Sequence, residues 1–220
     1  MTDINHDTPP DALLLLAPGC PHCPVVLEGL SGLVKEGVIG RLEAVNIASR
    51  PEVAQQLGVR SVPWIRIGEF VLQGLHSPAE LRQWAERAGS EDGLAAYYAD
   101  LLGQGRLQDV LDAVRERPGR LTALLRLAAD PDTELTQRIG VSAIVEDLAG
   151  SEALQAHLDT LADMARSDND RVRADAAHFL GQTRSERAKP LLQTLADDPD
   201  PVVREVAREA LESLPGPDQG

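Results

Sequence analysis

The chain has 220 residues, 43% of them hydrophobic and 25% charged, which is enough to bury the cores of one or two domains. Its 21 basic and 35 acidic residues give a formal net charge of −14, which argues against nucleic acid or an anionic membrane as the main partner. The acidic start of the chain and its short apolar runs predict neither a secretory signal nor a membrane anchor. No cysteine framework indicates an oxidising compartment, so we expect a cytoplasmic location.

Residues 12–88 alternate between strand and helix patterns. Strands are expected at 13–16, 42–47, 63–67 and 69–72, and helices at 25–35, 51–57 and 78–88. Ser49 is the expected N-cap of the second helix, and Ser77 begins the third with a capping box that includes Pro78 and Glu80. The order β-α-β-α-β-β-α predicts a compact α/β sandwich of about 80 residues.

Both cysteines of the chain lie in Cys20-Pro21-His22-Cys23, between the first expected strand and the first expected helix. Thiol–disulfide exchange requires this arrangement, because two thiols within one turn can form a disulfide and a helix N-terminus stabilises a thiolate. A CxxC at a helix N-terminus can lower the pKa of its first thiol from about 8.5 to between about 3.5 and 7.5. We therefore expect Cys20 to attack, Cys23 to resolve the mixed disulfide, and His22 to tune the thiolate.

A metal site is the competing interpretation of the same two thiols. A structural zinc site needs four ligands, and the chain has neither a second CxxC nor a nearby pair of histidines. A zinc or iron–sulfur site shared between two copies would still use both cysteines. The sequence favours a redox-active disulfide, with no other cofactor and no metal.

After a linker at 89–93, residues 94–214 carry helical patterns and no convincing strand. Helices are expected at 94–102, 106–116, 120–129, 134–148, 152–166, 171–182, 187–196 and 201–213. Val172 and Val203 begin matching segments with a period of 31 residues. One helix pair cannot bury its apolar stripe alone, so the units are expected to stack into an all-α solenoid. The ends of the chain, 1–11 and 215–220, are expected to be flexible.

Residues 12–88 resemble the thioredoxin-like superfamily, especially its smaller glutaredoxin-like members. The resemblance rests on the strand–CxxC–helix segment and on Gly58-Val59-Arg60-Ser61-Val62-Pro63, about forty residues later. In the family that proline follows a cis peptide bond, faces the CxxC and positions the backbone of a substrate. The resemblance thus implies a substrate-binding wall made of Pro21, Val62, Pro63 and Trp64, with Cys20 forming a mixed disulfide with a protein client.

Some positions differ from the best-known members of the family. Leu14 occupies the place, six residues before the first cysteine, where thioredoxins carry a buried acid. The segment 73–77 contains one glycine and no aspartate where glutaredoxins have Gly-Gly-x-Asp, so glutathione use is not expected. Pro24 makes the motif similar to that of archaeal protein disulfide oxidoreductases and alkyl hydroperoxide reductase flavoproteins. The Cys-Pro-His-Cys sequence is also like that of periplasmic thiol oxidases, which leaves the direction of the reaction open.

The helical half resembles short HEAT-like repeats of the kind also seen in phycobilin-lyase-type proteins. The resemblance rests on the pattern Asp-x-Asp-x-x-Val-Arg-x-x-Ala-x-x-x-Leu, which is clearest in the last two units. We expect the Asp-rich turns to cap the following helices, and Arg173 and Arg204 to pair with neighbouring acidic turns. The resemblance implies a surface for an unidentified protein partner.

Together these features predict a thiol–disulfide oxidoreductase joined to a helical recruiting domain, acting on protein disulfides through Cys20 and Cys23. The alternative is a redox-responsive scaffold, in which oxidation of the same pair changes partner binding and turnover is incidental. A catalytic protein would reduce or oxidise dithiols at a useful rate. A scaffold would show negligible turnover and an affinity that depends on redox state.

Overall fold

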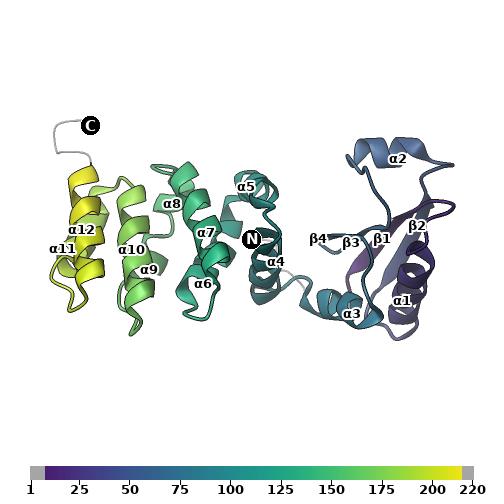
Figure 1. The fold of residues 1–220 in the computed structure, drawn as a ribbon, viewed down its shortest axis with the longest axis horizontal. Helices are drawn as coiled ribbons and strands as arrows, with labels where there is room; N and C mark the ends of the chain where they lie inside the picture. Colours follow the sequence, from purple (N-terminus) through teal and green to yellow (C-terminus); the bar gives the residue numbers. More distant parts are fainter. Residues whose placement is uncertain (1–7, 215–220) are drawn as a thin grey trace. The chain divides into compact units, whose positions relative to one another are not determined.

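The structure is a computed structural model that describes residues 8–214. The predicted flexible tail at 215–220, and residues 1–7 of the predicted flexible N-terminus, lie outside this range. The chain divides into two compact units, Met1–Leu94 and Ala95–Gly220, referred to below as the N-terminal and C-terminal units (Figure 1).

Within the described chain, the N-terminal unit has one mixed sheet of four strands in the order β2-β1-β3-β4 (Figure 1). The strands are β1 (Asp11–Leu16), β2 (Arg41–Asn46), β3 (Trp64–Ile67) and β4 (Phe70–Gln73). Strand β1 is parallel to β2 and antiparallel to β3, and β3 is antiparallel to β4. Leu14 and Leu15 of β1 are fully buried, because β1 has a strand on each side and its two side-chain rows face the two layers of the core.

Helices cover both faces of this sheet: α1 (Cys23–Lys35), α2 (Pro51–Gln56) and α3 (Pro78–Arg87). Helices α1 and α3 pack side by side on one face, where Trp84 meets Phe70 edge-on at 5.4 Å between ring centroids (Figure 1). The short helix α2 lies on the other face, where Ala54 joins a core cluster with Leu13, Leu15 and Trp64. The sheet therefore lies between two helical layers, as the sequence predicts.

The caps of these helices were predicted with mixed success. Ser77 Oγ accepts from the backbone N–H of Glu80, and the Glu80 carboxylate accepts from the backbone N–H of Ser77, so the capping box is confirmed. These hydrogen bonds lower the pKa of Glu80. The N-cap of α2 is Arg50 and not Ser49, because Asn46 Oδ1 accepts from Ala48 N–H and shapes the turn before the helix.

Helix α4 (Glu91–Gly103) begins inside the segment 89–93 where the sequence predicts a linker. The cause is Ser90, whose Oγ accepts from the backbone N–H of Gly93 at 2.9 Å and donates to the carbonyl of Arg87. The serine satisfies one of the free N–H groups at the start of a helix, so the chain becomes helical within the predicted linker.

The rest of the described C-terminal unit is helical, and its helices follow one another in pairs (Figure 1). They are α5 (Leu107–Glu116), α6 (Leu121–Ala129), α7 (Leu135–Asp147), α8 (Glu152–Gln155), α9 (Leu158–Met164), α10 (Asp170–Gln182), α11 (Lys189–Leu195) and α12 (Pro201–Ser213), with short 3-10 turns η1 (Pro118–Arg120) and η2 (Glu186–Ala188). The single helix predicted at 152–166 is wrong, since α8 and α9 are separate. His157 lies between them, with Nδ1 2.8 Å from the carbonyl of Ala153 and Nε2 3.1 Å from Thr122 Oγ1.

Arginine–carboxylate pairs connect successive helix pairs of the C-terminal unit. Arg173 binds Asp198 through two hydrogen bonds, Nε to Oδ2 at 2.8 Å and Nη2 to Oδ1 at 2.9 Å. Arg138 on α7 pairs with Asp175 on α10, where burial raises the pKa of the carboxyl. Arg204 reaches the same acidic turn through backbone carbonyls, those of Asp198 at 2.7 Å and Pro199 at 2.9 Å, so both arginines contact acidic turns and only Arg173 does so through a carboxylate.

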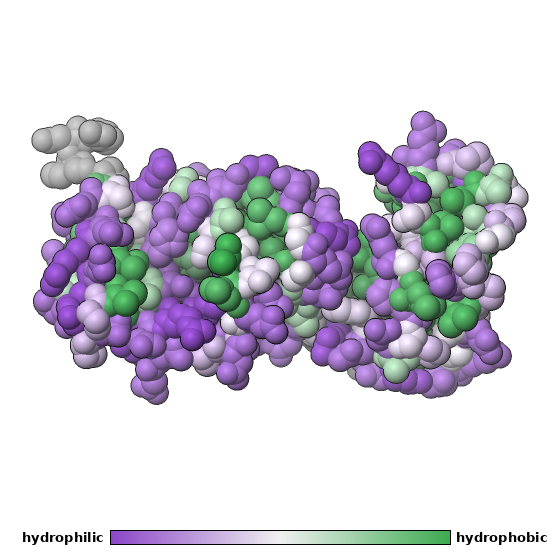
Figure 2. Space-filling model, viewed as in Figure 1, coloured by the Kyte–Doolittle hydropathy of each residue, from purple (hydrophilic) through white to green (hydrophobic). Residues whose placement is uncertain are grey.

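The visible face of each unit is mostly hydrophilic, with separate hydrophobic patches between the polar side chains (Figure 2). Among the described residues, no helix is both long and apolar enough to cross a membrane.

Candidate functional site

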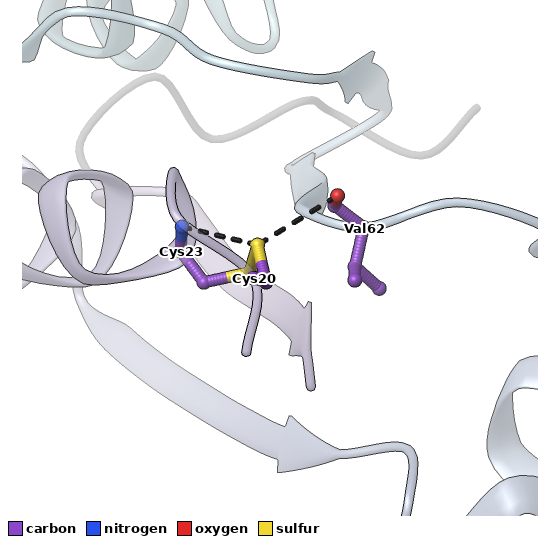
Figure 3. The surroundings of a disulfide bond; sticks show 3 residues. All are labelled: Cys20, Cys23 and Val62. Carbon is purple, nitrogen blue, oxygen red and sulfur yellow. Dashed lines mark hydrogen bonds between the residues drawn. A yellow bond between two sulfur atoms is a disulfide. The ribbon is translucent and has the colours of Figure 1, made fainter. Parts of the chain in front are cut away.

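The two cysteines lie where β1 gives way to α1, in a turn that brings them together. They form a disulfide with a Cα–Cα distance of 5.5 Å, and Cys23 is the first residue of α1 (Figure 3). Cys23 is buried, with 4% of its surface exposed, whereas Cys20 is only half-buried. The difference in access means that an approaching group meets Cys20 first.

The first residue of α1 directs its backbone N–H at the sulfur of Cys20, the more accessible of the two cysteines. The N–H of Cys23 lies 3.2 Å from Cys20 Sγ (Figure 3). The first N–H groups of a helix have no partner inside the helix, and their partial positive charge favours an anion. In the reduced protein the same N–H would favour the thiolate of Cys20 over its thiol.

The segment before β3 faces the disulfide from a distant part of the sequence. The Val62–Pro63 peptide bond is cis, and the carbonyl oxygen of Val62 lies 3.8 Å from Cys20 Sγ (Figure 3). Val62 is half-buried and Pro63 is buried. Because β1 and β3 are neighbours in the sheet, the loop before β3 lies beside the loop after β1, which brings these residues together.

The other predicted site residues differ in exposure. Pro21 and His22 are exposed, and His22 is the N-cap residue of α1 without a side-chain capping hydrogen bond. Trp64 has only 6% of its surface exposed and packs with Leu13 and Leu15 in the core cluster. Trp64 thus supports the sheet under the Val62–Pro63 segment, while Pro21 and His22 lie at the surface next to the cysteines.

The departures from the best-known redoxins also have a structural setting. Leu14 is fully buried in β1, so the place of the thioredoxin acid is filled by an apolar side chain. Gly74 N–H donates to the carbonyl of Pro63, and Leu75 after it is 53% exposed. Over residues 8–214, no group of three or more His, Cys, Asp or Glu side chains is placed to hold a metal ion.

The comparison with known families agrees with this geometry. The family described as Thioredoxin domain matches residues 12–86, and the family described as HEAT repeats matches residues 121–212. The chain joins a thioredoxin-like domain to HEAT repeats. The predicted α/β sandwich followed by an all-α repeat unit is thereby confirmed, and the paired cysteines of the thioredoxin-like domain fit redox activity. No curated protein matches the chain.

The sequence predicted that the helix N-terminus stabilises the Cys20 thiolate, but it did not identify the donor, which is the backbone N–H of Cys23. The signal was present in Pro24, which has no N–H and occupies the second position of the helix. Pro24 therefore cannot donate to the Cys20 sulfur, and the N–H of Cys23 makes that contact at 3.2 Å. The contact between Val62 O and Cys20 Sγ spans 42 positions and depends on the pairing of strands.

Proposed function

We propose that this protein is a thiol–disulfide oxidoreductase that acts on protein disulfides through Cys20 and Cys23. The observation that carries the proposal is the position of Cys20, half-exposed beside the start of α1, with the N–H of Cys23 at 3.2 Å. A nucleophilic thiolate needs both access and stabilisation, and this position provides both. In this proposal we assign residues 12–88 to the thioredoxin-like domain and residues 94–214 to the HEAT-like domain.

The reaction begins with the reduced pair. The Cys20 thiolate attacks one sulfur of a client disulfide, so a Cys20–client bond forms and the other client sulfur leaves as a thiolate. Cys23, once deprotonated, attacks Cys20 Sγ and displaces the second client thiolate. Two electrons pass from the cysteine pair to the client, the client thiolates take up protons, and the Cys20–Cys23 disulfide remains. A dithiol reductant then returns the pair to its starting state, and the same steps reversed oxidise a client dithiol.

Neighbouring residues have separate roles in this proposal. Val62 presents its backbone to the client beside the sulfur, while Pro63 and the buried Trp64 hold that segment in place. His22 and Pro21 form the exposed rim, where a protonated imidazole would favour the thiolate. The HEAT repeats bind a protein partner, and their covalent link to the thioredoxin-like domain raises the concentration of that partner near Cys20.

Trapping in cells tests the proposal directly. Cys23→Ser leaves Cys20 able to form a mixed disulfide that nothing resolves, so clients should accumulate as covalent complexes that dithiothreitol releases. Cys20→Ser is the matched control and should trap none. The reduced protein should also reduce insulin with dithiothreitol as the electron donor.

The result also separates the enzyme from the scaffold. No trapped client, no insulin reduction and a partner affinity that changes with the redox state of Cys20–Cys23 would identify a redox-responsive adaptor. The HEAT repeats favour this second candidate, since repeat surfaces of this kind serve protein–protein interaction.

A further inference from the structure

A groove of 440 Å³ runs between α1 and α3 on the outer side of the N-terminal unit. Val25, Gly32 and Pro78 contribute to its lining, as do the charged side chains of Glu28, Glu36 and Arg82. The residues from α1 recur every three or four positions, so they lie on one face of the helix over a length of about 16 Å. In the space-filling view, hydrophobic surface appears over the region of α1 (Figure 2).

The groove starts beside the redox site. Val25 lies two positions after Cys23 in the first turn of α1, and 47% of its surface is exposed. Covering this apolar side chain on binding would remove it from water and would favour the complex. A client held at Cys20 is the molecule that reaches Val25 first, so the groove continues the client-binding surface.

Gly32 keeps the middle of the groove open. A Cβ atom built on Gly32 would meet no other atom within 4 Å, so packing does not require glycine there. Glycine inside a helix costs about 0.5–1 kcal/mol relative to alanine, and this cost has no return within the fold. Gly29, one turn earlier, differs because its Cβ would lie 3.0 Å from Leu81 Cδ1. The fold itself does not use the space beside Gly32, so a side chain of a bound molecule can occupy it.

The charged side chains of the groove indicate which charge a bound molecule should carry. Arg82 already pairs with Glu36 across the groove and with Glu86 on its own helix. Within the part of the chain that the structure describes, Glu28 has no ion pair or hydrogen-bonding partner, so its carboxylate is available. The groove thus offers apolar surface beside an uncompensated negative charge, which complements an apolar side chain next to Lys or Arg.

We propose that the α1–α3 groove docks the protein client whose disulfide reacts at Cys20, by binding an apolar side chain flanked by a lysine or arginine. This inference rests on the proposed function and adds the chemistry of the client to it. Docking increases the local concentration of the client disulfide at Cys20. It therefore accelerates exchange with protein disulfides and leaves the rate with small disulfides unchanged.

Three synthetic peptides of about 20 residues test the inference. This length allows an extended spacer to lead from Cys20 to the groove and a helical segment to lie along it. Each peptide carries one cysteine in a mixed disulfide with thionitrobenzoate, followed by a spacer and a helical segment. The helical segment contains leucine and lysine in the first peptide, leucine and glutamate in the second, and alanine and lysine in the third. Attack by Cys20 of the reduced protein on the peptide sulfur releases coloured thionitrobenzoate, so the second-order rate constant of exchange is read directly. The small disulfide dithiobis(nitrobenzoate) measures the chemistry of Cys20 without docking.

The wild-type protein should prefer the leucine–lysine peptide about tenfold over the alanine–lysine peptide, and by a smaller factor over the leucine–glutamate one. Gly32→Leu fills the groove and should remove these preferences, while its rate with dithiobis(nitrobenzoate) stays at the wild-type level. Glu28→Gln should lower the preference for lysine about two- to fivefold. Gly119→Leu is the matched control and should leave the preferences unchanged. A Cβ built on Gly119 also meets no atom within 4 Å, and this residue lies in the C-terminal unit, outside the groove.

Four outcomes would overturn the inference. Equal rates for the three peptides, or a preference that survives both Gly32→Leu and Glu28→Gln, would overturn it while the redox function stands. Self-association that Gly32→Leu abolishes would identify a second copy of the chain as the occupant. Loss of all exchange in the wild type, the small disulfide included, would reject the proposed function and the inference together.

Discussion

The two units of this chain bring distant residues together in different ways. In the N-terminal unit, Cys20 and Val62 are 42 positions apart and meet because β1 pairs with β3. In the C-terminal unit, Arg173 and Asp198 are 25 positions apart and connect one helix pair to the next. The first contact depends on one sheet forming with one register, whereas the second belongs to a series of similar contacts between neighbouring repeats.

This difference predicts different responses to damage. A change at the redox site should remove its chemistry completely and leave the repeats folded. A change in one repeat contact should lower the free energy of unfolding of the C-terminal unit and leave the chemistry at Cys20 unchanged. Each of the following substitutions tests one side of this comparison.

The largest effect is expected from Cys20→Ser. It removes the attacking sulfur, so exchange with both protein and small disulfides should fall below detection. Cys23→Ser should retain the first attack and lose turnover, which distinguishes the two sulfurs. Stopped-flow release of thionitrobenzoate measures the first step, and insulin reduction measures turnover. Equal first-step rates for both variants would show that either sulfur can attack.

A large loss of stability is expected from Arg173→Gln in the C-terminal unit. Only 14% of the Arg173 side chain and 6% of the Asp198 side chain are exposed, so the substitution leaves a buried carboxylate without its partner. Breaking such a pair costs about 3–5 kcal/mol. Arg166→Gln is the matched control, because its pair with Asp163 is exposed and worth less than about 1 kcal/mol. Urea unfolding followed by helical circular dichroism measures both, and a similar loss for the two variants would contradict the prediction.

The same pair should make the stability of the C-terminal unit depend on pH. The hydrogen bonds from Arg173 hold the pKa of Asp198 below its ordinary value of 3.8. A carboxyl with a lowered pKa in the folded state stabilises the fold above its unfolded pKa, and this contribution is lost as pH falls through the folded value. The advantage of the wild type over Asp198→Asn should therefore be full at pH 6 and shrink steadily below pH 4. Unfolding midpoints at several pH values check this, and a constant difference would refute it.

Much of this architecture could be predicted, because local patterns determine it. The capping box at Ser77 and the order of strands and helices along residues 12–88 follow from residue types within a few positions. The division of the predicted helix 152–166 could not be foreseen, since His157 makes its contact with Thr122, 35 positions away. The sequence indicated that Arg204 contacts an acidic turn, but not that it would bind the backbone carbonyls of that turn, since carbonyls carry no sequence signature.

For the candidate site, the sequence indicated which residues to examine, but not how exposed each of them is. Cys20 and Cys23 were identified by spacing alone, and the Val62–Pro63 segment through a family resemblance. The exposure of each residue required the structure, which buries Trp64 in the core cluster and leaves His22 at the surface. The α1–α3 groove was also invisible in the sequence, because α3 reaches α1 only after the whole sheet is in place.

The smallest change in stability is expected when a helix glycine in each unit, Gly32 or Gly181, is replaced by alanine. Gly32→Ala should stabilise the N-terminal unit by about 0.5–1 kcal/mol, since it improves helix propensity and meets no neighbouring atom. Gly181→Ala should destabilise the C-terminal unit, because its Cβ would lie 2.8 Å from Ala210 Cβ and 3.2 Å from the Ala210 Cα. Thermal unfolding of both variants measures the signs. Opposite signs would show that glycine at 181 serves helix packing and that glycine at 32 does not, whereas a loss of stability in Gly32→Ala would mean that the fold itself requires glycine at that position.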